Sequence, residues 1–340
     1  MQTIRVKMKG ISILCVSMLF VIGNACTAQT VQNMETNHPL LCDTNTGICE
    51  VPGTTAADNG AIRTNVDTAG LKIIYFTDPI CSSCWGIEPQ LRKLKLEYGN
   101  RITVEYRMGG LLPDWSYNSG GISKPSDVAT HWDEASLYYD MPIDGDVWLE
   151  HPLASSYPAC IAFKAAQLQG EDKALHFMRL MREAVFMHKQ NIALLEVLIQ
   201  IARQANLEPT KFEMDYNGKA RDLFNEDLQL GRTMGVRGFP TLFFTSAQAQ
   251  TQVVYGSKPY ADFEAAILHV LPGTLKMQYA KSWQDLFAKY GSLTAREYAE
   301  LSDSPRANAE AFLDGLCKEK KLQKFSTKNG AIWFLPQTKQ

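Results

Sequence analysis

Two cysteines separated by two serines form the strongest candidate for a reactive site in this sequence. The tetrad Cys81-Ser82-Ser83-Cys84 follows an apolar, β-branched and aromatic run at residues 71–77, which predicts a buried strand. Apolar residues then recur at helical spacing over residues 85–98, so Cys81 should lie near the N-terminus of a helix. Unpaired backbone N–H groups and the helix dipole stabilise a thiolate there, which predicts a lowered pKa for Cys81. The expected chemistry is thiol–disulfide exchange, in which Cys81 attacks a disulfide and Cys84 resolves the mixed disulfide.

The C-x-x-C spacing also has competing interpretations. With eight cysteines in 340 residues, chance alone produces it about 0.16 times. The alternatives are half of a zinc site or a structural pair of cysteines. Zinc needs a second Cys/His pair at ligand spacing, and none follows in the sequence, so no metal site is predicted. The position between a strand and a helix favours redox chemistry.

The tetrad and a distant loop together resemble the DsbA-like branch of the thioredoxin superfamily. Asp78-Pro79 precedes the tetrad and Trp85 follows it, and Pro89 is similar to the proline that kinks thioredoxin active-site helices. Far downstream, Gly238-Phe239-Pro240-Thr241 resembles the cis-proline loop that faces the C-x-x-C in the superfamily. Cis peptides are inexpensive only before proline, and a cis turn leaves backbone groups free to pair with a substrate strand. The alternative for Pro240 is an ordinary proline before a strand.

Within this branch the chain resembles the FrnE-like and SpxH-like subgroup over roughly residues 71–271. The segments that carry this likeness are residues 108–115, 157–166 and 235–240. The resemblance implies an α/β thioredoxin fold with a large helical insertion at about residues 116–234.

The resemblance also implies roles for individual residues. Cys81 and Cys84 would be the catalytic pair, and the substrate groove would be shaped by three neighbours in sequence, Phe239, Pro240 and Thr241. Asp78 is a candidate relay for the proton of Cys84. The alternative is that Asp78 forms a turn before its proline.

The first 28 residues predict an export signal. Basic residues precede an apolar segment at residues 11–22, which is too short for a stable span, and no later stretch is long and apolar enough to cross a membrane. Cys26 ends a loose lipoprotein-type cleavage box, and cleavage after Ala28 is the alternative. We therefore expect a periplasmic protein or a lipoprotein anchored to the membrane through Cys26.

Residues 29–70 are polar, lack periodicity and predict a tether. Within them, Cys42 and Cys49 flank a run of turn-forming residues. One interpretation is a small loop disulfide, and another is a relay dithiol that exchanges with Cys81 and Cys84. A soft-metal site is the third, although two sulfurs and a nearby aspartate are too few ligands.

Residues 274–340 exceed what a thioredoxin domain needs. Thr294 as N-cap with Glu297 in a capping box predicts a helix, Ser304-Pro305 begins another, and Asn329-Gly330 predicts a hairpin. This succession resembles a small α+β winged-helix module. Its lysines would suit phosphate contacts, but the export signal argues against nucleic acid, and lysines also suit the end of a helix. We expect a docking or packing subdomain.

Composition is consistent with a folded protein of one or two domains. Hydrophobic residues make up 45% of the chain and the net charge is −2, so nothing indicates a nucleic-acid or acidic partner. We expect an exported thiol–disulfide oxidoreductase that acts on cysteine-containing proteins, has a partner that reoxidises or reduces it, and needs no cofactor beyond its dithiol. The alternative is a non-catalytic holdase or adaptor on the same scaffold, as in SpxH-like protease adaptors, although the export signal argues against a cytosolic adaptor.

Overall fold

The computed structural model describes residues 42–43, 46–50, 70–116, 122–248 and 250–336. All of them belong to one compact unit, Thr36–Gln340. The predicted signal segment and the candidate lipidation site Cys26 lie outside the described residues. Within the described ranges, none of the helices has the length and apolarity that a bilayer span requires.

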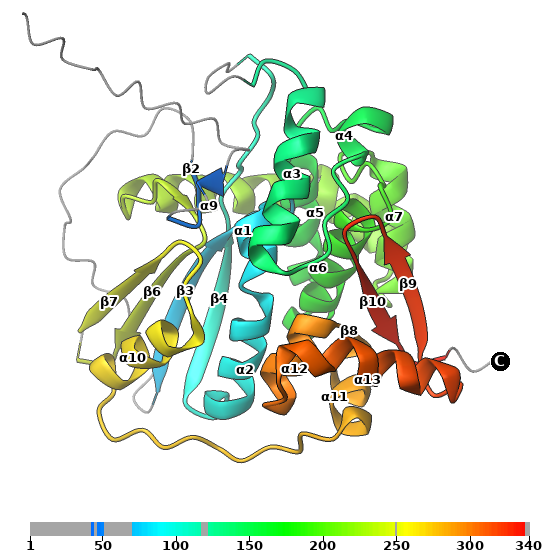
Figure 1. Ribbon diagram of the computed structural model, residues 1–340. Coiled ribbons are helices and arrows are strands. Elements are labelled where there is room, and N and C mark those ends of the chain that lie inside the picture. The colour runs from blue at the N-terminus through cyan, green and yellow to red at the C-terminus, as the bar shows by residue number, and fades with distance from the viewer. Residues whose placement is uncertain (1–41, 44–45, 51–69, 117–121, 249, 337–340) are drawn as a thin grey trace, which may run out of the picture. The chain divides into compact units, whose positions relative to one another are not determined.

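A four-stranded sheet forms the centre of the fold, in the order β4-β3-β6-β7 (Figure 1). Strand β3, Leu71–Thr77, pairs in parallel with β4, Ile102–Met108, and antiparallel with β6, Thr241–Ser246, which in turn pairs with β7, Thr251–Tyr255. Six of the seven residues of β3 are buried, because helices and neighbouring strands surround it. The strand predicted at residues 71–77 is confirmed.

The helix that begins at the tetrad is broken in two. Helix α1 spans Ser82–Gly86 and α2 spans Glu88–Tyr98, with Ile87 between them. Pro89 lies in the first turn of α2, where its missing N–H costs no helical hydrogen bond. The predicted kink is therefore present, and α2 is the crossover that makes β3 and β4 parallel.

A helical insertion separates β4 from the second half of the sheet. It comprises α3 Ser126–Tyr139, α4 Val147–Glu150, α5 Tyr157–Gln167, α6 Glu171–Phe186, α7 Leu195–Gln204, α8 Pro209–Asn217 and α9 Lys219–Thr233. Helix α8 begins at a proline. Pro209 stands in its first turn, and Glu208 caps the helix by accepting from two backbone N–H groups. After β5, Gly238–Phe239, and the β6–β7 hairpin, α10, Tyr260–Val270, packs against the sheet.

A short N-terminal hairpin lies where the sequence predicts only a tether. Strand β1, Cys42–Asp43, pairs antiparallel with β2, Ile48–Glu50, which pairs antiparallel with β5. Strands this short carry no readable hydrophobic period, and an isolated two-stranded hairpin is marginal at best. The hairpin forms because β5 offers it an edge.

The C-terminal residues form the predicted winged-helix-like module. Its elements are α11 Trp283–Tyr290, β8 Ser292–Thr294, α12 Ala295–Ser302, α13 Arg306–Lys318, β9 Gln323–Thr327 and β10 Gly330–Phe334. The three strands form a sheet in the order β8-β10-β9, and the capping box of Thr294 and Glu297 is present. The module has its own apolar cluster, centred on buried residues such as Leu313 and Trp333, which Leu96 of α2 joins.

Lysines of this module are held by carboxylates. Lys328 Nζ lies 2.7 Å from Asp133 Oδ2 and 2.6 Å from Asp146 Oδ1, both on the insertion. Lys324 Nζ lies 3.0 Å from Asp314 Oδ1 within the module. These contacts use the basic groups to fix the module in place, in agreement with a packing role.

Candidate active site

Cys81 and Cys84 lie where β3 passes into α1. Cys81 is the N-cap of α1, and the backbone N–H of Cys84 donates to its Sγ at 3.2 Å. Both thiols are free and completely buried. The predicted position of Cys81 at a helix N-terminus is confirmed.

The predicted acidic thiolate at Cys81 is not what the structure shows. Burial raises the pKa of Cys81 well above its ordinary value and outweighs the N–H bond from Cys84. Burial opposes ionisation of Cys84 as well, but contacts with Cys81, Arg182, Thr77 and Tyr75 lower its pKa. In this closed arrangement the negative charge is therefore better accommodated on Cys84. The prediction from sequence considered only the helix terminus, because the burial of Cys81 by distant segments cannot be read from the sequence.

Arg182 of α6 provides the positive charge beneath Cys84. Its Nη2 donates to Thr77 Oγ1 at 2.9 Å, and Thr77 Oγ1 donates to Tyr75 Oη at 3.1 Å. Its Nη1 also pairs with Glu88 Oε2 at 2.8 Å. Sequence reasoning missed Arg182, because the insertion helix that carries it reaches β3 only through tertiary packing.

The residues around the tetrad are held by the insertion. Trp85 is buried, stacks on Phe186 and donates from Nε1 to Pro142 O at 3.1 Å. Ser83 Oγ lies 2.5 Å from Tyr139 Oη at the end of α3. Tyr139 also belongs to the site without any sequence signal to mark it.

The Phe239–Pro240 peptide bond is cis, as the resemblance implies, and the residues before it pair with β2, with Cys49 opposite Phe239. The side chains of Phe239 and Thr241 are buried, and Thr241 Oγ1 donates to Gly238 O at 2.7 Å. A Cβ at Gly109 would lie 1.7 Å from Phe239 Cζ, so only glycine leaves room for this ring. These side chains therefore shape the loop from inside, while its backbone pairs with β2.

Cys49 of β2 lies next to Cys81. Its Sγ lies 3.3 Å from Cys81 Sγ and 3.4 Å from Ser83 Oγ, and its side chain is fully buried. Cys49 is disulfide-bonded. The side chain of Cys42, its predicted partner, lies outside the described residues, so that pairing stays a prediction from sequence.

Comparison with known proteins places this geometry in a family. A family model described as thioredoxin matches residues 75–265. A ClpXP adapter protein SpxH from Halalkalibacterium halodurans is 33% identical over 269 residues, covering 77% of this chain and 88% of the relative. The chain belongs to the SpxH-like group of DsbA-like thioredoxin-superfamily proteins.

Two further comparisons agree with this assignment. The ClpXP adapter protein SpxH of Bacillus subtilis is 30% identical over 268 residues, with 77% of this chain and 88% of the relative covered. The crystal structure of a putative protein disulfide isomerase from Nitrosomonas europaea superposes with a TM-score of 0.51 at 21% identity, over 59% of this chain and 96% of that one. At this identity the superposition shows the fold only.

Asp78 of this SpxH-like protein is buried and bonded away from Cys84. Its Oδ1 accepts from Ile80 N at 3.0 Å, which closes a turn. Its Oδ2 accepts from Leu111 N at 2.7 Å, Ser156 Oγ at 2.8 Å and Cys160 Sγ at 3.3 Å. Burial raises its pKa in spite of these donors. The contacts agree with the turn-forming alternative, and a role in moving the proton of Cys84 stays a prediction.

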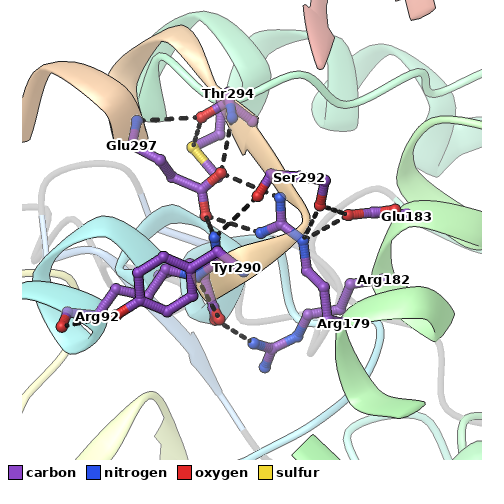
Figure 2. Close-up of polar contacts among 10 residues, drawn as sticks. Arg92, Arg179, Arg182, Glu183, Tyr290, Ser292, Thr294 and Glu297 are labelled. Carbon is purple, nitrogen blue, oxygen red and sulfur yellow. Dashed lines mark hydrogen bonds and ion pairs between the residues drawn. The ribbon is translucent and has the colours of Figure 1, made fainter. Parts of the chain in front are cut away.

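The C-terminal module contacts the active-site helix, which comprises α1 and α2, through a buried ion-pair cluster (Figure 2). Glu297 accepts from Arg179 Nη1 at 2.7 Å and Nη2 at 3.0 Å, and it lies 3.2 Å from Arg92 Nη1 on α2. The Arg179 guanidinium also lies 4.5 Å from the centre of a Trp85 ring. The module thus supports the residue that follows Cys84 through one intermediate side chain.

A metal centre has no ligand set in this region. Within the described ranges, no group of three or more His, Cys, Asp or Glu side chains is arranged to hold a metal ion. Cys160 and Cys317 are free thiols outside the tetrad, and Cys160 is buried beside Asp78.

Proposed function

We propose that this protein is an exported thiol–disulfide oxidoreductase that exchanges disulfides with cysteine-containing proteins. The observation that carries the proposal is the pair of free thiols at the start of α1. Cys81 caps the helix and its Sγ accepts from the N–H of Cys84, and the Phe239–Pro240 bond of the predicted cis-proline loop is cis. Strand β5 supports the proposal further, because its edge pairs with an extended segment as a substrate would.

The reaction needs only the two thiols and the substrate disulfide. The thiolate of Cys81 attacks one substrate sulfur, so an S–S bond forms between enzyme and substrate and the other substrate sulfur leaves as a thiolate. The thiolate of Cys84 then attacks Cys81 Sγ and releases the second substrate thiolate. Two electrons have moved from the enzyme to the substrate, and the same steps in reverse oxidise a substrate dithiol. Arg182 stabilises the thiolate of Cys84 before its attack.

No cofactor beyond the dithiol enters this scheme, but turnover requires a redox partner that restores the pair. The N-terminal segment supports a periplasmic location or a lipid anchor at Cys26. Fractionation of cells that express the wild type or Cys26→Ser tests this. The reduction potential of the pair determines the direction of exchange, and spacing and geometry do not give that potential.

The second candidate function is that of a non-catalytic adaptor or binding protein. The observation that favours it is the name of the two relatives described above, which are ClpXP adapter proteins. The burial of both thiols in the described arrangement agrees with it, because an adaptor does not need an accessible nucleophile. The two candidates differ in whether Cys81 and Cys84 are needed.

A redox titration distinguishes them. A Cys42→Ser/Cys49→Ser chain is equilibrated in glutathione buffers, and the oxidised fraction of the remaining pair is read by thiol alkylation and mass spectrometry. A reversible transition near about −120 to −180 mV would indicate an oxidase or isomerase, and one near about −270 mV a reductant. Absence of any reversible transition in folded protein would refute the enzyme proposal. Full retention of function by Cys81→Ser/Cys84→Ser would support the adaptor.

A further inference from the structure

The N-terminal hairpin occupies the edge at which a substrate strand would bind. Strand β2 pairs antiparallel with β5, with Cys49 opposite Phe239 and Glu50 opposite Gly238. This edge directly precedes Pro240 and lies at the end of the sheet where α1 begins (Figure 1). Addition of an extended segment to an exposed strand edge is a general mode of peptide recognition. The hairpin thus binds its own chain as a peptide substrate would.

The hairpin packs tightly against the residues that flank the β6–β7 hairpin. A Cβ at Gly238 would lie 2.5 Å from Ile48 Cγ2 and 2.7 Å from Cys49 O. A Cβ at Gly256 would lie 2.3 Å from Thr46 O. On the other side, Ser257 N donates to Gly47 O at 2.8 Å. Two glycines thus leave the room into which the hairpin packs.

The contact at the centre of this interface is between sulfurs in different redox states. Cys49 is disulfide-bonded, whereas Cys81 and Cys84 are free thiols. Cys81 Sγ and Cys49 Sγ are 3.3 Å apart. Reacting atoms in a near-attack arrangement lie about 3–3.5 Å apart, so the nucleophile is already next to a disulfide sulfur.

We propose that the hairpin is a tethered substrate, and that Cys81 exchanges with the disulfide of Cys49 within the same chain. This rests on the proposed redox function and deepens it by naming the first partner of the catalytic pair. The sequence supplies Cys42 as the other half of that disulfide, and the backbone register places Cys42 opposite Cys49. The described state is the reactant of this step.

The exchange balances without any external oxidant. The Cys81 thiol gives up its proton as its Sγ attacks Cys49 Sγ, so a Cys81–Cys49 bond forms, the Cys42–Cys49 bond breaks, and the Cys42 thiolate that leaves takes up that proton. The Cys84 thiolate then attacks Cys81 Sγ and releases Cys49. Two electrons pass from Cys81 and Cys84 to the hairpin, which becomes a dithiol. The hairpin dithiol can then pass these electrons to a disulfide of another protein by the same exchange.

This arrangement accounts for the burial of the catalytic pair. Cys81, Cys84 and Cys49 are all fully buried, so an external disulfide cannot reach Cys81 while the hairpin is docked. Electrons therefore leave through the hairpin, or the hairpin undocks first. Since the reacting groups share one chain, the rate of the internal step should not change when the protein is diluted.

The test uses the full chain with Cys84→Ser, which cannot resolve the mixed disulfide. The protein is incubated without oxidant in iodoacetamide, which captures any Cys42 thiol that exchange releases, and is then digested under non-reducing conditions. Mass spectrometry should find the Cys81 peptide joined to the Cys49 peptide with Cys42 alkylated, in equal yield at different protein concentrations. Cys84→Ala should give the same product, which guards against a folding defect peculiar to serine. Cys81→Ser should keep the original disulfide and leave Cys42 unalkylated.

A docking variant provides the matched control. Gly238→Val places a side chain against Ile48 without touching either thiol, so the yield of the cross-link should fall about tenfold or more. An intact hairpin disulfide in folded Cys84→Ser and Cys84→Ala, with no Cys81–Cys49 peptide, would overturn the inference. The redox function stands in that case if Cys81 and Cys84 still titrate in the Cys42→Ser/Cys49→Ser chain. It fails separately if they do not.

Discussion

Replacement of Glu297 by glutamine should strongly destabilise the contact between the C-terminal module and the active-site helix. Glu297 is completely buried and accepts hydrogen bonds from both terminal nitrogens of Arg179 (Figure 2). Arg92 Nη1 lies 3.2 Å from Glu297 Oε1. Glutamine has the same shape and retains an oxygen that can accept from Thr294 N, so the capping box survives. The substitution therefore removes the charge, and it also places the amide nitrogen, a donor, opposite Arg179 Nη1 and Arg92 Nη1 in place of the Oε1 acceptor.

The size of the effect follows from what remains. Breaking a buried ion pair by removing one partner costs about 3–5 kcal/mol, since the other charge stays buried. Here Glu183 still lies 2.5 Å from Arg179 Nε, and Glu88 lies 3.5 Å from Arg92 Nε. Because each arginine keeps one carboxylate, we expect the lower end, about 3 kcal/mol. With an m-value of about 3 kcal/mol/M, the urea midpoint should fall by about 1 M.

Urea unfolding followed by circular dichroism measures this difference, and Arg306→Ala is the matched control. Arg306 joins the same module to Asp140 of α3 through two hydrogen bonds of 2.5 and 2.6 Å, but both side chains are exposed. Its loss should cost less than about 1 kcal/mol. If Glu297→Gln costs no more than Arg306→Ala, the reasoning from burial is refuted.

The pH dependence supplies a second, independent readout of the same pair. Burial alone would raise the pKa of Glu297, but Arg179 and Arg92 overcome it, so the pKa lies below the ordinary value of 4.5. A depressed folded-state pKa contributes stability above the unfolded-state pKa and loses it as the pH falls through the folded-state pKa. The stability difference between wild type and Glu297→Gln should therefore be full at neutral pH and shrink below about pH 4.5. A difference that stays constant in acid would contradict the assignment.

Three further predictions concern the thiols and the proline loop. Arg182→Met should raise the pKa of Cys84, because a nearby positive charge is lost; thiolate absorbance against pH measures it, and an unchanged pKa would exclude Arg182 as the cause. Gly109→Ala should cost about 1–3 kcal/mol in urea unfolding and slow glutathione exchange, since the new methyl group meets the ring of Phe239; wild-type stability would show that the ring can move aside. Deletion of the N-terminal hairpin should lower the pKa of Cys81, because burial raises it; alkylation rates at several pH values test this, and an unchanged profile would assign the burial to other elements.

The parts of the site that the sequence predicted are those encoded locally. The apolar run of β3, the tetrad at its end and the glycine–proline loop each carry their signal within a few residues. The structure has the strand and the helix start at the predicted residues, and the Phe239–Pro240 bond is cis as expected. Local chemistry fixes the identity of a thiol pair at a helix terminus, and this needs no knowledge of distant segments.

What the sequence could not supply depends on contacts across long separations. Arg182 acts on Cys84 from the insertion, and nothing near it in sequence distinguishes it from the buried Arg179 one turn earlier. The strands at Cys42–Asp43 and Ile48–Glu50 exist only against the edge of β5, so their residues look like a tether when taken alone. The pKa of Cys81 was mispredicted for the same reason, because burial outweighs the helix terminus.

Two segments from outside the matched thioredoxin region, residues 75–265, meet the active-site helix at different places. The N-terminal hairpin contacts Cys81 itself, and the C-terminal module reaches Trp85 through the Glu297–Arg179 pair. The family region contains the dithiol, and in the described arrangement the hairpin contacts Cys81 while the module contacts the residue after Cys84 through Arg179. A chain can therefore keep the C-x-x-C and the proline loop and still serve as a binder, if its hairpin stays docked. For this reason the redox titration of Cys81 and Cys84, more than family membership, decides between an enzyme and an adaptor.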